Sequence, residues 1–266
     1  KTRASPRALN ERAIAARTVA EVIGGRSLDD ALNALTPAAR TPFVQSLCYG
    51  CLRWWWPLQA ISAHFVEKPL KNKDRDVLAL LYGAWFQLLW LETPVHAAVN
   101  ETVAAADDLG KSWAKNLLNA VLRAGVRAGN DALRALAELT PEARYSHPAW
   151  LLQALARDWP QDWQALCAAN NAQAPMHLRV NRQRLTRDDY LAALRAQGLD
   201  ARAVPAHADA VTLVAPVPVN KLPGFADGWV SVQDLGAQWA APLLNTQPAE
   251  AVLDACAAPG GKAAHI

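Results

Sequence analysis

Cysteine is scarce in this sequence, and its scarcity limits the class of protein. The 266 residues contain four cysteines, scattered at Cys48, Cys51, Cys167 and Cys256. Small secreted proteins that depend on disulfide bonds carry denser sets of cysteines, because their cores are too small to hold the fold alone. We therefore expect no disulfide framework and a protein of the reducing cytoplasm.

A long apolar run is also missing. The most apolar stretch, residues 77–91, is interrupted by Gln87 and is shorter than the roughly 18 residues that indicate a membrane span. The N-terminal residues 1–10 contain no apolar signal core. We therefore expect neither a membrane segment nor a secretion signal, and we interpret residues 77–91 as a buried helix.

Two common nucleotide-binding loops are absent around Gly261 and Lys262. A phosphate-binding loop, Gly-x-x-x-x-Gly-Lys-Ser/Thr, would require glycine at position 256 and a hydroxyl at position 263. The chain has Cys256 and Ala263 there, which argues against hydrolysis of ATP or GTP. The dinucleotide pattern Gly-x-Gly-x-x-Gly is missing too, so nicotinamide and flavin cofactors have no support.

Apolar side chains are abundant, since 52% of the residues are hydrophobic and 19% are charged. The length predicts about two domains. The formal net charge is only +3, but basic residues gather in two segments. One holds Lys1, Arg3, Arg7, Arg12 and Arg17, and the other holds Arg179, Arg182, Arg184 and Arg187. Such clusters suit contact with a phosphate backbone, although a solvated helix face explains the first cluster equally well.

Helical spacing dominates residues 6–139. The clearest example is a stripe of apolar residues three and four positions apart, which places them on one face of a helix. The stripe consists of Leu78, Leu81, Tyr82, Trp85, Leu88 and Leu89. We therefore expect a compact all-α bundle in this half of the chain.

Residues 141–222 mix helix and strand patterns. Residues 149–166 have helical spacing, and residues 176–181 alternate as a half-buried strand does. Thr186 with Asp189 three residues later resembles a helix capping box. Further strand candidates are Val211, Leu213, Val217 and Val219. A small α/β region is expected here.

Near the end of the sequence, an apolar run meets a glycine-rich turn. Residues 251–253 have the character of a strand buried on both faces, and Asp254 lies where such a strand would leave its sheet. Gly260 and Gly261 then leave a bare backbone that a ligand can approach closely. A tight glycine turn between a strand and a helix, without a ligand, is the structural alternative.

The stretch Asp-Ala-Cys-Ala-Ala-Pro-Gly-Gly-Lys at 254–262 resembles the S-adenosylmethionine loop of the RNA cytosine-5 methyltransferases. Residues 222–225 and 228–234 resemble the segment that leads into this loop in that family. The resemblance implies S-adenosyl-L-methionine as the cofactor. It assigns the cofactor contacts to Cys256, Ala257, Ala258, Pro259, Gly260, Gly261 and Lys262.

The helical half resembles the NusB-like RNA-binding domain. Three blocks carry this resemblance in the family's order, namely residues 43–53, 94–103 and 115–123. A NusB-like bundle before such a loop is typical of the bacterial Sun/Fmu (RsmB-like) enzymes, which methylate a cytosine of 16S ribosomal RNA. The resemblance implies a multidomain fold: an all-α NusB-like domain (1–140), a small ferredoxin-like α/β RNA-binding subdomain (141–222) and the start of a Rossmann-like methyltransferase domain (223–266).

The strand pattern at residues 178–181 resembles the characteristic strand of that RNA-binding subdomain. The residues that this resemblance assigns to RNA are Arg179, Asn181, Arg182 and Arg184. A second interpretation stays open for Arg179 and Asn181, which could equally brace the strand.

Catalysis in this family uses cysteine thiolates from motifs that follow the cofactor loop. One thiolate adds to carbon 6 of cytosine, which makes carbon 5 nucleophilic enough to attack the sulfonium methyl group. No cysteine follows Cys256, which itself occupies a loop position. We therefore expect no catalytic residue and no turnover in this chain, and we expect the gene to continue past Ile266 into the missing motifs.

The expected partner is ribosomal RNA, 16S above all, bound by a monomer without metal or membrane. Two other classes stay open: a non-catalytic RNA-binding module built on the NusB-like domain, and a helical protein-interaction domain. Salt-sensitive RNA binding would separate the last class from the others.

Three other features carry weaker hypotheses. Cys48 and Cys51 have the spacing of a zinc or redox pair, but in a helical segment core packing is the better interpretation. The run of tryptophans at 54–56 offers either a stacking surface for RNA bases or packing against neighbouring elements. His96, at the start of a helix, is interpreted as a capping or packing residue.

Overall fold

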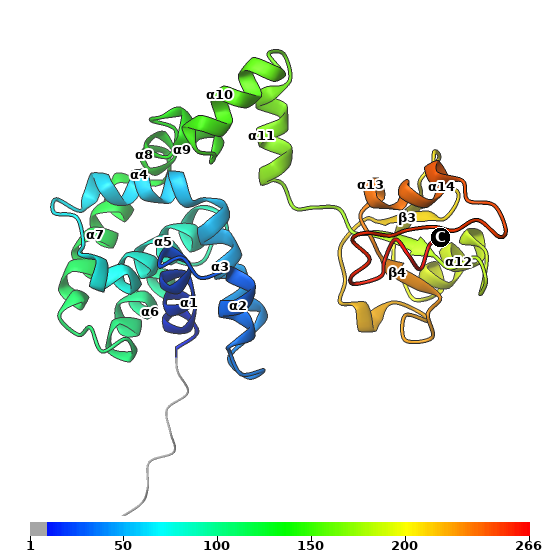
Figure 1. Ribbon diagram of the computed structural model, residues 1–266. Helices are drawn as coiled ribbons and strands as arrows, with labels where there is room; N and C mark the ends of the chain where they lie inside the picture. The colour runs from blue at the N-terminus through cyan, green and yellow to red at the C-terminus, as the bar shows by residue number, and fades with distance from the viewer. Residues whose placement is uncertain (1–9) are drawn as a thin grey trace, which may run out of the picture. The chain divides into compact units, whose positions relative to one another are not determined.

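The structure, a computed structural model, describes residues 10–266. The chain divides between Ala172 and Gln173 into two compact units, and Figure 1 labels most of their helices and some of their strands. Unit 1 is built of helices and unit 2 is built on a small sheet. The finer domain boundaries expected after residues 140 and 222 stay predictions.

Unit 1 confirms the all-α bundle. Its helices are α1 (Glu11–Ile23), α2 (Leu28–Asn33), α3 (Pro42–Arg53), α4 (Trp55–Phe65), α5 (Arg75–Leu89), α6 (Val95–Asp108), α7 (Ala114–Ala128), α8 (Asn130–Leu136), α9 (Pro141–Tyr145), α10 (Ala149–Asp158) and α11 (Trp163–Asn171). Several begin at side chains that accept a hydrogen bond from a backbone N–H of the first turn, as Asn10, Thr41 and Thr140 do. Such caps satisfy N–H groups that have no partner within the helix.

Helix α5 is the centre of unit 1, which confirms the buried helix expected at residues 77–91. It packs against α1, α3, α4, α6 and α7, and Val77 and all residues from 79 to 89 are buried. The polar atoms that this burial removes from water are paired: Trp85 Nε1 donates to Ser62 Oγ at 3.2 Å, and Gln87 Nε2 donates to the Gly83 carbonyl at 2.8 Å. The stripe seen in the sequence is therefore only one side of a helix that is covered all round.

The helix expected over residues 149–166 is two helices. Helix α10 ends at Asp158 and α11 begins at Trp163. Pro160 lies between them, and a proline inside a helix lacks the N–H that would continue the hydrogen-bond ladder. The prediction of helix was right, but its continuity was wrong.

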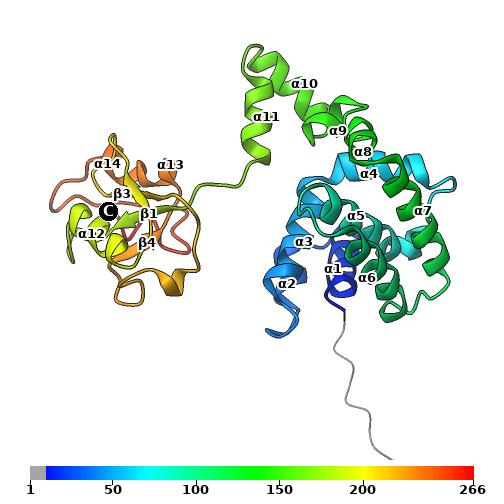
Figure 2. The ribbon, with the colours of Figure 1, turned by 180° about the vertical axis from the view of Figure 1, so that it is seen from behind.

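Unit 2 holds a four-stranded antiparallel sheet in the order β2-β3-β1-β4. Its elements are β1 (His177–Val180), α12 (Arg187–Ala196), β2 (Ala201–Ala203), β3 (Ala210–Leu213), β4 (Val230–Val232), α13 (Leu235–Gln238) and α14 (Ala240–Leu244). Figure 2 shows β1, β3 and β4 with α12 beside them. This arrangement confirms the small α/β region expected from the sequence.

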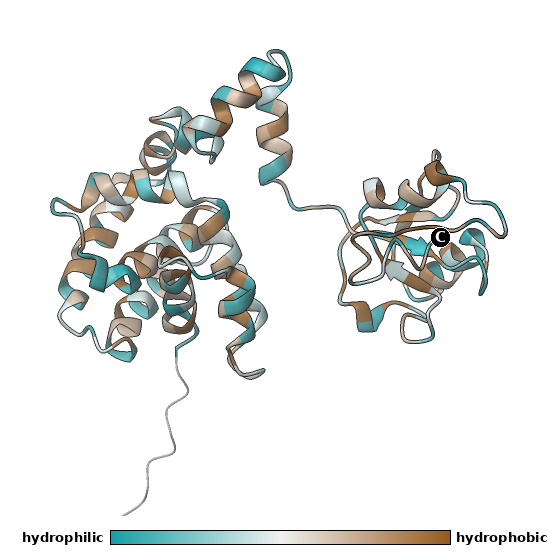
Figure 3. Cartoon of the chain, in the orientation of Figure 1, coloured by the Kyte–Doolittle hydropathy of each residue, from teal (hydrophilic) through white to brown (hydrophobic). Residues whose placement is uncertain are grey.

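The core of unit 2 lies between the sheet and α12. Tyr190 and Leu194 of α12 pack with Leu178 and Val180 of β1 and with Val211 of β3. The cap predicted at Thr186 is confirmed, because its hydroxyl accepts the N–H of Asp189 at 3.2 Å. Both units show the alternation of hydrophobic and hydrophilic stretches that amphipathic elements produce (Figure 3).

Two strand predictions are wrong. Val217 lies outside any strand, and Val219 begins a short 3₁₀ helix. Residues 251–253, expected as the first strand of a Rossmann-like domain, form no ladder, and Val252 and Leu253 are 43% and 88% exposed. A strand of that kind needs neighbouring strands on both sides. Among residues 10–266 the sheet of unit 2 consists of β1 to β4 and does not include residues 251–253.

Candidate nucleic-acid and cofactor-binding site

The candidate site lies around Arg179, on the side of β1 that faces away from α12. Successive side chains of a strand point to opposite faces, so Leu178 and Val180 enter the core while Arg179 turns to the other side. That side is also covered, and Arg179 is only 9% exposed. Burial lowers the pKa of Arg179, and the carboxylate of Asp209 opposes this shift.

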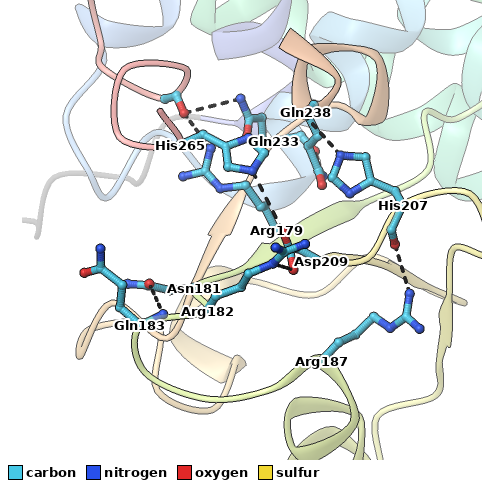
Figure 4. A network of polar contacts seen from close by, with 11 residues as sticks. Arg179, Asn181, Arg182, Gln183, Arg187, His207, Asp209, Gln233, Gln238 and His265 are labelled. Atoms are coloured by element: carbon cyan, nitrogen blue, oxygen red, sulfur yellow. Dashed lines mark hydrogen bonds and ion pairs between the residues drawn. The ribbon is translucent and has the colours of Figure 1, made fainter. Parts of the chain in front are cut away.

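Arg179 joins the strand to the glycine-rich loop. Its Nη1 donates to the Gln233 side-chain oxygen at 2.6 Å and to the Gly261 carbonyl at 2.6 Å. Figure 4 shows Arg179 and Gln233 within this network of polar contacts. The Gln233 side chain also donates to the Gly261 carbonyl, at 3.4 Å. One carbonyl of the loop is therefore held by donors from two separate segments, and one of these donors carries a charge.

Asp209 is the acidic centre of this cluster. It is buried, it accepts a hydrogen bond from Arg182 Nε, and its carboxylate lies 3.9 Å from His265 Nε2. Burial first, and the positive charge of Arg179 second, lower the pKa of His265, which leaves its ring neutral at pH 7. Arg182 is the charged group hydrogen-bonded to this carboxylate, and Arg179 also interacts with it electrostatically.

A cavity of about 510 Å³ opens beside these groups. Arg179, Asn181 and Arg182 line one part of it, and Asn245 and His265 line another. Donors of this kind, around a hollow with a partly exposed arginine, suit a phosphate or the polar edge of a base.

The structure places the four residues predicted to bind RNA in different settings. The Asn181 side chain donates to the Gly228 carbonyl at 3.0 Å and accepts from the Gln183 N–H at 3.1 Å, so it braces a turn. The Arg182 side chain is 67% exposed at the rim of the cavity, and Arg184 is exposed. Only Arg182 and Arg184 present their guanidinium groups to solvent, whereas Arg179 is engaged within the protein.

Asp209, His265 and the role of Gln233 could not be predicted from the sequence. Asp209 lies in the turn before β3, and His265 lies 56 positions further along the chain. No local pattern joins positions so far apart. Gln233 alone stood in a segment that the family resemblance marked, because it leads into the glycine-rich loop.

The loop at residues 255–262 offers an open backbone. Gly260 has φ +97°, and nothing lies within 4 Å of the position that a Cβ would take there. Asp254 Oδ1 accepts the Cys256 N–H at 3.0 Å, while its Oδ2 is buried without a partner among the described residues. An approachable backbone therefore lies beside an unsatisfied acceptor, and the assignment of Cys256 to Lys262 to a cofactor stays a prediction.

The cysteine pair and two of the three consecutive tryptophans are packing residues. Cys48 and Cys51 are buried in the core of unit 1, and burial raises the pKa of the Cys48 thiol to about 12. Trp54 stacks on Trp90 with ring centroids 4.9 Å apart, and Trp55 meets Tyr82 edge-on at 5.0 Å. Core packing is therefore confirmed for both cysteines and for these two tryptophans.

The described residues contain no grouping of three or more His, Cys, Asp or Glu side chains suited to a metal ion. None of the helices described is long and apolar enough to cross a membrane. His96 is exposed near the start of α6, and no side chain of the described residues caps that helix, so the capping or packing interpretation of His96 is wrong.

Of the N-terminal basic cluster, Lys1, Arg3 and Arg7 lie outside the described residues. Arg12 donates to the Gln87 side chain at 3.0 Å, and Arg17 donates to the Asp108 carbonyl. Both described members of the cluster are thus tied to neighbouring helices.

Family models agree with this architecture. Residues 9–127 match the NusB family, and residues 147–220 match the ferredoxin-like domain of RsmF/B-like methyltransferases. A solved structure, "Crystal Structure of PH0851", covers 100% of this chain and 61% of its own with a TM-score of 0.66 and 16% identity. At that identity the likeness shows the fold alone.

Curated proteins are similar in sequence to nearly the whole chain. Ribosomal RNA small subunit methyltransferase B of Pseudomonas syringae pv. tomato is 46% identical over 265 residues, which is 97% of this chain and 58% of that protein. The protein of the same name from Vibrio cholerae is 44% identical over 97% of this chain and 60% of its own length. The chain is homologous to these proteins over nearly its whole length and spans about 60% of theirs.

Proposed function

We propose that the protein is an S-adenosylmethionine-dependent RNA methyltransferase that modifies carbon 5 of a cytosine in 16S ribosomal RNA. The observation that carries this proposal is the attachment of the loop to β1: Arg179 donates to the Gly261 carbonyl at 2.6 Å. The names of the relatives support ribosomal RNA as the substrate. The NusB-family match supports an RNA partner, and the sequence of the loop at residues 254–262 supports S-adenosylmethionine as the cofactor.

In this proposal the two sides of the site have separate tasks. Arg182 and Arg184 contact RNA phosphates near the cavity, since both are exposed and basic groups provide most of the affinity for RNA. The loop from Cys256 to Lys262 binds the cofactor, which supplies a methyl group on a sulfonium centre. Arg179 and Gln233 fix the loop through the Gly261 carbonyl, and so fix the distance between RNA and cofactor.

The attacking thiols are proposed to come from outside the 266 residues. Cys48, Cys51 and Cys167 are buried, and Cys256 is exposed within the loop. Burial raises the pKa of all three buried thiols, which disfavours the thiolate that nucleophilic attack requires. The 266-residue chain should therefore bind RNA without transferring a methyl group.

The test is transfer of a labelled methyl group from S-adenosylmethionine to 16S ribosomal RNA. The protein expressed from the complete gene should label one cytosine at carbon 5, as mass spectrometry of nuclease fragments would show. The 266-residue chain should label none. Labelling by the short chain would overturn the proposal that the attacking thiols lie outside the 266 residues. Labelling by the complete protein at a base nitrogen or a ribose would overturn the assignment to carbon 5.

One observation favours a second candidate, a non-catalytic RNA-binding module. Strand β4 is an edge strand of the sheet of unit 2, and residues 251–253 are exposed and belong to no sheet. The core of unit 2 therefore forms without these residues. Salt-sensitive RNA binding by the complete protein, with no heat of binding on titration of S-adenosylmethionine, would favour this candidate.

A further inference from the structure

An exposed tryptophan stands beside a group of lysines on unit 1, far in sequence from the site described above. Trp113, the residue before α7, is 55% exposed. It lines a hollow of about 320 Å³ together with Lys68, Pro69, Leu70, Lys71, Lys73 and Asp74 from the segment before α5. Trp113, Lys68, Leu70, Lys71 and Lys73 are called the Trp113 surface below.

Lys111 holds the two segments of this surface together. Its Nζ donates to Asp74 Oδ1 at 2.6 Å and to the Lys73 carbonyl at 3.0 Å. Asp74 is buried, so this contact is shielded from water more than an ordinary surface pair. The hollow is therefore built by a specific contact between residues 73–74 and 111.

The lysines of the Trp113 surface keep their charge available. Lys68, Lys71 and Lys73 are exposed, and none of them forms an ion pair with another described residue. The nearby acids Asp74 and Asp76 face Lys111, at 2.6 and 3.9 Å, and Lys115 pairs with Asp107. Glu67 is the one exposed acid among residues 67–73, so positive charge exceeds negative charge around the indole.

We propose that the Trp113 surface binds a single-stranded segment of RNA. The Trp113 indole stacks on one base, and Lys68, Lys71 and Lys73 contact the phosphates next to it. An aromatic platform in a positively charged hollow is the arrangement that unpaired nucleic acid requires, because its bases are free to stack and its phosphates attract cations. RNA as the ligand rests on the proposed function, but the surface needs neither cofactor nor catalysis.

The test is binding of the 266-residue chain to a fluorescein-labelled oligouridylate, followed by anisotropy at several salt concentrations. Trp113→Ala should weaken binding by roughly five- to 150-fold and leave the salt dependence unchanged, since stacking involves no counterion release. Trp113→Phe should retain most of the affinity because it keeps an aromatic face.

Replacing the lysines should change the salt dependence of binding, which replacing Trp113 should leave unchanged. In the triple variant Lys68→Gln, Lys71→Gln, Lys73→Gln, the slope of log K against log salt should become shallower by about 0.7 for each phosphate that is no longer neutralised, or about 2 in all. Trp150→Ala is the matched control, because Trp150 is 69% exposed on α10 and lies outside the surface. It should bind as the unchanged chain does.

Equal affinity of Trp113→Ala and the unchanged chain would overturn the proposal, as would an unchanged salt slope in the triple lysine variant. Binding of an RNA duplex as tightly as the single strand would also overturn it, because paired bases cannot stack on the indole. These outcomes leave the proposed methyl transfer intact, since that is measured with the complete protein. Failure of methyl transfer would in turn leave the binding signatures unaffected.

Discussion

At the scale of single residues, the burial and hydrogen bonds of Arg179 distinguish two hypotheses that the sequence left open. A basic residue in a strand that resembles an RNA-binding motif can face the ligand or brace the fold. The side chain is 9% exposed and donates to Gln233 and to the Gly261 carbonyl. A buried guanidinium with partners in the loop supports the bracing hypothesis, while Arg182 and Arg184 remain the proposed RNA contacts.

Arg179→Gln should loosen the glycine-rich loop. The change removes two charge-assisted hydrogen bonds, each worth about 1.5–3 kcal/mol when one partner is charged. Cys256 provides the probe, because it is exposed while the other three cysteines are buried. A nitroxide on Cys256 should give a spectrum with faster motion in the Arg179→Gln variant.

Arg184→Gln is the control for this measurement, since Arg184 is exposed and its guanidinium is not tied to the loop. It should leave the nitroxide spectrum unchanged. Labelling should also stop at one thiol per chain, because burial raises the pKa of Cys48 to about 12. A nitroxide equally mobile in the unchanged chain and in Arg179→Gln would show that Arg179 does not hold the loop.

At the scale of elements, the sequence best predicted the helices and strands whose own apolar side chains form a buried face. The helical stripe of α5 and the alternation of β1 both mark faces that are buried. β2 and β4 have three residues each, and a strand this short is defined by pairing with its neighbours rather than by its own side chains. The same dependence on neighbours explains the failure at residues 251–253, where an apolar run has no adjacent strand to pair with among residues 10–266.

Close packing between α7 and α5 predicts opposite effects for two helical glycines. A Cβ at Gly125 would lie 2.4 Å from the Trp85 ring, whereas one at Gly83 would have nothing closer than Cys51 Sγ at 4.0 Å. Trp85 is fully buried and hydrogen-bonded to Ser62, so it has little room to move. Gly125→Ala should therefore lower the free energy of unfolding by about 1–3 kcal/mol.

Gly83→Ala should raise the free energy of unfolding by about 0.5–1 kcal/mol, because alanine loses less backbone entropy in a helix. Urea unfolding of both variants, followed by far-ultraviolet circular dichroism, measures the pair. Stabilisation by both alanines would mean that Trp85 moves aside and that the packing between α5 and α7 is looser than the structure has it.

At the scale of the whole molecule, the order of the modules could be predicted from the sequence. Blocks in the helical half and the loop letters indicated a NusB-like bundle before a methyltransferase segment, and the family matches at 9–127 and 147–220 agree with the first two modules. The contact that joins β1 to the loop could not be predicted, because it depends on a hydrogen bond between residues 82 positions apart. Long-range contacts of this kind leave no periodic trace in a single sequence.

A pair of calorimetric titrations on the protein from the complete gene tests the proposal most directly. The proposal is that β1 holds the loop that binds the cofactor while neighbouring arginines bind RNA. S-adenosylmethionine and a 16S ribosomal RNA fragment are titrated separately into Arg179→Gln and Arg184→Gln. We expect Arg179→Gln to weaken cofactor binding and largely to spare RNA binding, and we expect Arg184→Gln to weaken RNA binding and to spare cofactor binding. Loss of RNA affinity in Arg179→Gln with unchanged cofactor affinity would contradict the proposal.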